Sequence, residues 1–266
     1  MGFVRRPAVA GTFYPDDPRD LELAVGNYLR AGERLDDQAA AAAPKAVIAP
    51  HAGYIYSGPV AASVYARLAP ARERIRRVVL MGPAHRVPLR GLAVSGAEAF
   101  LTPLGPVPVD GAAVEAIVSL DQVEVLDAAH EGEHSLEVQL PFLQRVLERF
   151  AIVPIVAGRA APEQVGEVLE RLWGGDETLI VISSDLSHYN DYDTARRMDA
   201  ATSRAIEALR PAEIGPHDAC GSAAIGGVLR VAEKRGLGAR TIDLRNSGDT
   251  AGPRDRVVGY GAYAFQ

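Results

Sequence analysis

Three of the six histidines lie a few residues after a short apolar run of strand length. The three are His51, His85 and His188, and the runs before them are Ala46–Ala49, Arg77–Met81 and Leu179–Ile182. Ligands in open α/β sheets bind beyond the carboxyl ends of the strands. If these runs are neighbouring parallel strands, the three imidazoles meet in one crevice.

Two carboxylates occupy comparable places, Asp185 after the third run and Asp249 after the stretch Thr241–Leu244. Neutral imidazole together with carboxylate suits Fe, Zn, Cu or Mn, and two histidines with one carboxylate ligate many non-haem Fe(II) sites. Such a site keeps positions open for water or substrate. A lone histidine after a strand is more often a loop residue, so the prediction depends on their convergence.

The segment His130–His134 matches the zinc-protease pattern H-E-x-x-H. That pattern requires both histidines on one continuous helix. Gly132 interrupts the segment, and the amphipathic run begins only at Leu136. We therefore interpret it as a loop, from which His134 and Glu137 reach the crevice as supporting groups.

Four other features of the sequence support predictions, and two of them, Tyr54 and Cys220, allow two interpretations. Tyr54 follows His51 closely and either lines the pocket or packs with its hydroxyl at the surface. Gly58-Pro59 is expected to open the next helix, because proline suits a first helical position. Cys220, near a predicted helix start, is either a reactive thiol or, as we favour, a small packing residue. His217 is expected at the surface.

The strand–loop–helix alternation predicts a single α/β domain over residues 1–266, with a mostly parallel sheet between helices on both faces. The predicted strands are Ala46–Ala49, Arg77–Met81, Gly91–Ser95, Ile152–Val156, Leu179–Ser183, Thr241–Leu244 and Val257–Tyr263. The predicted helices are Leu21–Leu29, Val60–Leu68, Ala112–Ser119, Leu136–Arg149, Pro162–Trp173, Asp191–Leu209 and Ser222–Arg235. Gly91–Asp110, rich in proline and glycine, is expected to be an antiparallel excursion.

Composition excludes several classes of function. The net charge of −6 argues against nucleic acid or acidic membranes as partners. No apolar run approaches the roughly 20 residues that span a bilayer, and the N-terminus lacks the apolar region of a signal peptide. One cysteine allows no internal disulfide, which fits the cytoplasm. The alanine-rich stretch Asp36–Pro44 is interpreted as a surface linker. Dinucleotide, P-loop and α/β-hydrolase motifs are missing from the sequence.

Six stretches, in order along nearly the whole chain, resemble the Memo family, whose prokaryotic members are called AmmeMemoRadiSam system protein B. They are Arg6–Pro15, Ala49–Tyr54, Gly82–His85, Glu133–Glu137, Ser183–His188 and Asn246–Asp249. The resemblance implies a fold similar to class III extradiol ring-cleavage dioxygenases, which are non-haem iron enzymes. It implies that His51 and His85 are metal ligands, with Asp185 and His188 in the same pocket. It also implies AMMECR-type and radical SAM partner proteins.

One departure bears on the metal. The resemblance leads us to expect a cysteine on the final segment, and this segment, around Asn246, has none. Asp249 is the nearest substitute, with His188 as the other candidate. Exchange of thiolate for carboxylate favours Fe(II), Mn or Zn over Cu(I), so Fe(II) is the preferred cofactor.

Three functions remain open at this point. The first is a metal-dependent oxidoreductase of dioxygenase type, in which Asp185 and His188 are catalytic and move protons. Tyr54, His134, Glu137 and Asn246 would surround the ligands. The second is a non-catalytic module that binds a peptide, phosphate or metal and acts through protein partners. The third is metal-assisted hydrolysis.

Overall fold

The computed structural model describes residues 2–33 and 42–266, which form one α/β domain around a nine-stranded sheet. Its order is β10 (His188–Asn190), β12 (Val257–Phe265), β2 (Ala46–Ala49), β9 (Thr178–Ser183), β3 (Arg77–Pro83), β8 (Ala151–Ala157), β4 (Leu92–Val94) and β7 (Val123–Val125), with β11 (Ala239–Asn246) also paired to β12. The four central strands β2, β9, β3 and β8 are mutually parallel. Antiparallel pairs flank them through β12 and β4, so the predicted parallel sheet holds at the centre.

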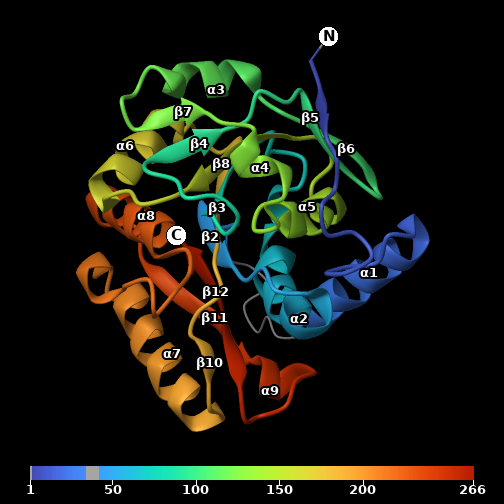
Figure 1. Ribbon diagram of the computed structural model, residues 1–266, viewed down its shortest axis with the longest axis vertical. Coiled ribbons are helices and arrows are strands. Elements are labelled where there is room, and N and C mark those ends of the chain that lie inside the picture. The colour runs from blue at the N-terminus through green and yellow to red at the C-terminus, as the bar shows by residue number, and fades with distance from the viewer. Residues whose placement is uncertain (1, 34–41) are drawn as a thin grey trace.

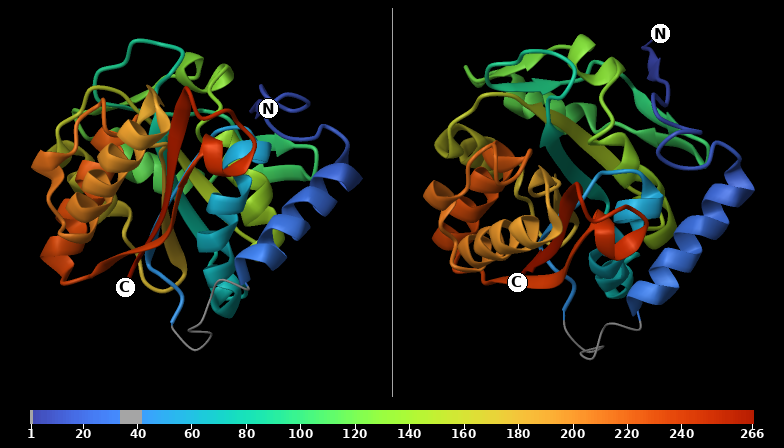
Figure 2. Two further views of the ribbon diagram at one scale, coloured as in Figure 1. Left: turned by 90° about the horizontal axis from the view of Figure 1, so that it is seen from below. Right: turned by 60° about the horizontal axis from the view of Figure 1, so that its bottom comes forward.

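Helices cover both faces of this sheet (Figure 1). One face carries α1 (Pro18–Glu33), α2 (Tyr54–Tyr65) and α5 (Leu140–Val146), and the other carries α3 (Gly111–Val118), α6 (Pro162–Leu172), α7 (Tyr192–Glu207) and α8 (Ser222–Arg235). Figure 2 shows α1 lying against α2, and α7 packing beside β11 and β12.

The strand sequences explain why both faces are covered. Side chains alternate between the faces of a strand, and the residues of β2 are apolar on both sides. Val47 and Ala49 belong to the core under α2, whereas Ala46 and Ile48 belong to the core under α8. A strand buried on both sides reads as a continuous apolar run, which is why these strands were predictable.

The stretch Gly91–Asp110 is the antiparallel excursion that the sequence predicted. After β4, the chain forms the hairpin of β5 (Ala99–Thr102) and β6 (Gly105–Pro108). A third strand, β1 (Val4–Arg5), pairs with β5 in parallel and completes a separate three-stranded sheet. This small sheet fixes the N-terminal segment over the loops that carry the site.

Two helix predictions were wrong in detail. Helix α2 begins at Tyr54 and contains Pro59 in its interior, so Gly58-Pro59 does not open it. Ile55, whose carbonyl loses its partner at Pro59, is 62% exposed, so water can replace that hydrogen bond. The region expected as Leu136–Arg149 is a 3₁₀ turn, η2 (Glu137–Gln139), followed by the short α5, which has Pro141 in its first turn.

Shorter elements complete the chain. They are η1 (Ala66–Ala71), α4 (Ala128–Glu131), η3 (Pro211–Glu213) and α9 (Ser247–Thr250). Most of the stretch interpreted as a linker, Asp36–Pro44, lies outside the described residues. Within the described part of the chain, every helix is too short or too polar to cross a bilayer.

Candidate metal centre

The carboxyl ends of three adjacent strands form the floor of the site. His51 follows β2 and His85 follows β3, and β9, which lies between them, leads to Asp185. The backbone N–H of His51 donates to Asp185 Oδ1 at 2.7 Å, which ties two of these loops together. The predicted convergence at one sheet edge is therefore present for these three residues.

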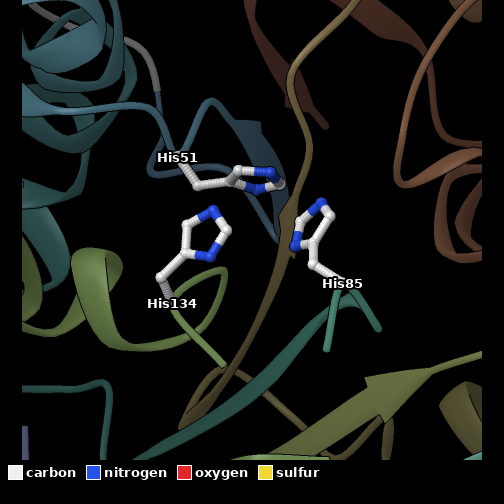
Figure 3. Close-up of side chains that lie close together, drawn as sticks. All are labelled: His51, His85 and His134. Atoms are coloured by element: carbon white, nitrogen blue, oxygen red, sulfur yellow. The ribbon is translucent and has the colours of Figure 1, made fainter. Parts of the chain in front are cut away.

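Three imidazoles come together above this floor, and Figure 3 shows them facing one another. One ring nitrogen from each of His51, His85 and His134 lies within 4.8 Å of the other two. The ring centroids are 5.2 Å apart for His51 and His85, 5.5 Å for His51 and His134, and 4.7 Å for His85 and His134. His134 comes from the loop between α4 and η2, where the sequence predicted only a supporting role. This cluster could hold a divalent metal ion.

Hydrogen bonds identify which nitrogen of His51 is available. The Ser183 hydroxyl donates its one proton to the Ser135 carbonyl at 2.5 Å, and it accepts from Gln139 Nε2 at 2.8 Å. It must therefore also accept from His51 Nδ1, which lies 2.9 Å away. The proton is on Nδ1, so Nε2 of His51 carries the lone pair that could bind a cation.

Glu133 connects the other two imidazoles. Its Oε1 accepts from His85 Nδ1 at 2.9 Å and lies 3.4 Å from His134 Nδ1, while its Oε2 accepts from the His85 N–H at 2.6 Å. A carboxylate behind a metal-binding histidine fixes the ring orientation and makes the imidazole more basic. The bond to Glu133 leaves Nε2 of His85 as its available nitrogen. Sequence reasoning missed Glu133, although it lies inside the discounted H-E-x-x-H segment.

The protonation states suit a cation. Burial, reinforced by His85, lowers the pKa of His51 to about 3, and burial lowers that of His134 to about 4. Both rings are therefore neutral at pH 7, which is the form that binds metals. Burial opposes ionisation of Glu133, but hydrogen bonds from His85 and Ser135 outweigh it and hold its pKa at about 2.

Cys220, for which we favoured a packing role from the sequence, lies beside His51. Its Sγ is 3.3 Å from His51 Nε2. It precedes the N-cap of α8, and a Cβ on Gly221 would come within 2.7 Å of Ser184, so only glycine permits this approach. Burial raises the pKa of the Cys220 thiol to about 12, and a bound cation would favour its thiolate. The cysteine of this chain thus lies near His51 on the segment before α8, and the final segment has none.

A pocket of about 610 Å³ opens over the three histidines. Its walls include His188 and Asp185, as predicted, together with Phe13, Tyr56 and Tyr260. His188 Nδ1 bonds to the Leu186 carbonyl at 2.8 Å, so this nitrogen carries the proton and Nε2 can accept one. Burial raises the pKa of Asp185. Cys220 does not line this pocket; it borders a larger cavity of about 1260 Å³ whose lining contains none of the histidines.

The structure does not gather four of the predicted site residues around the imidazoles. Asp249 is exposed, and it accepts from Tyr192 Oη at 2.6 Å and from the Asn246 N–H at 3.0 Å, as part of the α9 cap. The Asn246 side chain accepts from the Gly248 N–H in the same cap. Asp249 as a ligand is therefore a prediction that the geometry does not support, because its carboxylate is used to start a helix.

The other two predicted pocket residues are buried elsewhere. Glu137 accepts from the N–H groups of Ala8 and Val9 at 2.7 and 3.0 Å and pairs with Arg5. Tyr54 is 3% exposed and donates to the Val138 carbonyl. His130, the first histidine of the H-E-x-x-H match, lies 3.1 Å from the Ala93 carbonyl, away from the cluster.

Comparison with known proteins assigns the family. The family model for Memo-like proteins matches residues 5–264. The chain belongs to the Memo family. A MEMO1 family protein of Aquifex aeolicus is 38% identical over 97% of both chains, and one of Methanosarcina mazei is 37% identical over 97% of this chain and 98% of that one. The family resemblance read from the six stretches is therefore confirmed.

The fold also has a solved counterpart. The crystal structure of the uncharacterized protein JW3007 from Escherichia coli K12 superimposes with a TM-score of 0.52 at 13% identity, covering 81% of this chain and 98% of that chain. At this level of identity the likeness concerns the fold alone. It supports the predicted α/β architecture of this Memo protein.

Proposed function

We propose that this Memo protein is a metal-dependent oxidoreductase whose divalent ion is held by His51, His85 and His134, with Fe(II) as the ion that the resemblance to non-haem iron dioxygenases implies. The observation that carries the proposal is the mutual approach of these three imidazoles beneath an open pocket. Cys220 is the candidate fourth donor, because its sulfur lies 3.3 Å from Nε2 of His51. When bound, such an ion supplies Lewis-acid and redox chemistry at a position open to substrate.

The residues fit a divalent cation by their own chemistry. Nδ1 of His51 bonds to Ser183 and Nδ1 of His85 bonds to Glu133, so Nε2 of each ring can bind the ion. His134 Nδ1 is buried without a hydrogen bond and lies 3.4 Å from Glu133 Oε1, and the ring packs against Phe13 at 4.8 Å between ring centroids. Neutral imidazoles with the possibility of a thiolate accept Fe, Zn, Mn or Cu.

Proton transfer falls to the pocket residues beside the histidines. His188 Nδ1 is bonded to the Leu186 carbonyl, so Nε2 is the nitrogen that can accept a proton from a substrate. Asp185 is buried with a raised pKa and hydrogen-bonds the backbone of His51. A positioned acid or base of this kind typically contributes about 10²–10⁴-fold in rate.

The alternative of a non-catalytic module rested on the absence of a clear third ligand. His134 supplies a third imidazole, so that reason no longer applies. Metal-assisted hydrolysis would use the same open site, with a carboxylate as base. The AMMECR-type and radical SAM partners stay a prediction, which co-purification from the native cell would test.

The decisive experiment measures metal in purified variants. We expect about one divalent ion per chain in the native protein after incubation with Fe(II) under anaerobic conditions, and loss of that ion in His51→Ala and His134→Ala. His217→Ala is the matched control, because His217 is exposed and does not belong to the three-histidine cluster. Stoichiometric metal in a folded His51→Ala variant would refute the site. Oxygen uptake by the native iron protein with catechol-type substrates separates turnover from simple binding.

A further inference from the structure

The rim of the metal pocket carries an irregular strand. β10 pairs antiparallel with β12, with His188 opposite Val258 and Asn190 opposite Val257. The register shifts between His188 and Asn190, so Tyr189 is the extra residue of a β-bulge, with φ at +62°. Bulges re-aim side chains near active sites, and a left-handed tyrosine persists only where its surroundings fix it. Here the bulge turns the Tyr189 ring outward, where it is 63% exposed at the pocket rim.

An arginine uses that ring as its platform. The guanidinium carbon of Arg256, in the turn just before β12, lies 4.5 Å from the Tyr189 ring centroid. Both side chains line the pocket. Across the described ranges 2–33 and 42–266, Arg256 forms no ion pair with a carboxylate within 4.0 Å. Among the described residues the Arg256 guanidinium has no hydrogen-bond acceptor either, so its N–H groups can bind a ligand in the pocket.

The pocket lining has more positive than exposed negative charge, which also favours an anionic ligand. Asp185 is the acidic residue in its lining, and that carboxyl is buried and engaged with the His51 N–H. Arg86 adds a second positive charge at the rim, with Nε donating to the Gly132 carbonyl. The chain as a whole has a net charge of −6, so this positive rim is local.

The walls indicate the shape of the ligand. Phe13, Tyr56 and Tyr260 contribute aromatic side chains, and the volume of about 610 Å³ lies within the range of small-molecule sites. We propose that the pocket takes a small aromatic carboxylate, whose acid group is recognised by Arg256 on the Tyr189 platform while its other end faces the histidines. Guanidinium and carboxylate match each other in a bidentate geometry. This inference rests on the proposed function and adds the substrate class to it.

Two chelating probes that differ only in an acid group test the inference. Benzohydroxamate and 4-carboxybenzohydroxamate are titrated calorimetrically into the Zn(II)-loaded protein, because zinc avoids redox chemistry. We expect the carboxylated probe to bind about tenfold more tightly, as suits one charge-assisted contact. Arg256→Gln should abolish that preference and leave the affinity for benzohydroxamate unchanged. Tyr189→Ala should reduce the preference, and Tyr189→Phe should retain it, since only the ring supports the arginine.

Arg254→Gln is the matched control. Arg254 stacks on Tyr192 at 4.4 Å, two residues away from Arg256, but it does not line the pocket. The preference should survive in this variant. Equal affinity of the native zinc protein for both probes, or a preference that persists in Arg256→Gln, would overturn the inference while the metal site stands. Failure of the native protein to hold zinc would instead refute the proposed function.

Discussion

Replacement of Glu133 by glutamine tests how the imidazoles are held. The carboxylate accepts from His85 twice, through Nδ1 at 2.9 Å and the backbone N–H at 2.6 Å, and from the Ser135 N–H at 2.8 Å. Glutamine keeps the shape but removes the charge, and its NH₂ group must face at least one of these donors. The His85 ring then loses both its orientation and the partner that makes it more basic.

The expected loss of metal affinity can be estimated from other carboxylates that hydrogen-bond to metal-binding histidines. Loss of a carboxylate behind a metal-binding histidine typically costs about 10–100-fold in metal affinity. This corresponds to about 1.4–2.8 kcal/mol. Because the pKa of Glu133 is held at about 2, the native carboxylate is charged across the whole neutral range. Protonation of Glu133 itself therefore contributes nothing to the loss at neutral pH.

Competition with a chromophoric chelator measures the Zn(II) dissociation constant of each variant. Glu131→Gln is the control, since Glu131 belongs to the same segment and is exposed. Near-ultraviolet circular dichroism and urea unfolding of the metal-free proteins verify that Glu133→Gln is folded. A folded Glu133→Gln protein that binds zinc within twofold of the native affinity would refute the reasoning.

Three further predictions concern Cys220, His134 and the buried Asp199. Cys220→Ser should remove the near-ultraviolet sulfur-to-metal charge-transfer band of the Co(II) protein; a native Co(II) protein without this band would show that Cys220 is no ligand. Zn(II) at 100 times its dissociation constant should stabilise the native protein by about 2.7 kcal/mol in urea unfolding and leave His134→Ala unchanged. Burial raises the pKa of Asp199 to about 6, so the folded protein loses stability as the pH rises from about 4 through 6 and this carboxyl is forced to ionise. Asp199→Asn should therefore be more stable than the native protein by up to about 3 kcal/mol at pH 8 and equally stable at pH 4. A difference in unfolding free energy that does not change with pH would contradict this.

The sequence predicted the elements that are buried on both faces and the residues that directly follow them. β2 is apolar throughout and β3 is apolar after Arg77, and both strands end at the same edge of the sheet, so His51 and His85 were expected at that edge. The convergence of these two residues could be inferred because parallel strands end on the same side. Asp185 followed for the same reason.

The remaining donors could not be inferred because they come from irregular segments. His134 lies in a loop, and Cys220 precedes α8, so no periodicity connects either of them to His51. Asp249 was misplaced because proximity to a strand end is insufficient when the side chain is used to cap α9. The glycine after Cys220 was the one local signal, since it permits close approach to Ser184.

The position of His134 depends on the N-terminal segment, which is distant in the sequence. Arg5 donates to the carbonyls of His130 and Glu133 and pairs with Glu137, and all three acceptors belong to the segment that carries His134. Tyr14 also donates to Glu137, at 2.5 Å, and Phe13 packs its ring against His134. Both charged groups of the Arg5–Glu137 pair are almost fully buried, and removal of one partner from such a pair is strongly destabilising. The third imidazole is thus held in place by contacts that exist only after the N-terminal strand has joined its sheet, so the metal centre forms as a consequence of the complete fold.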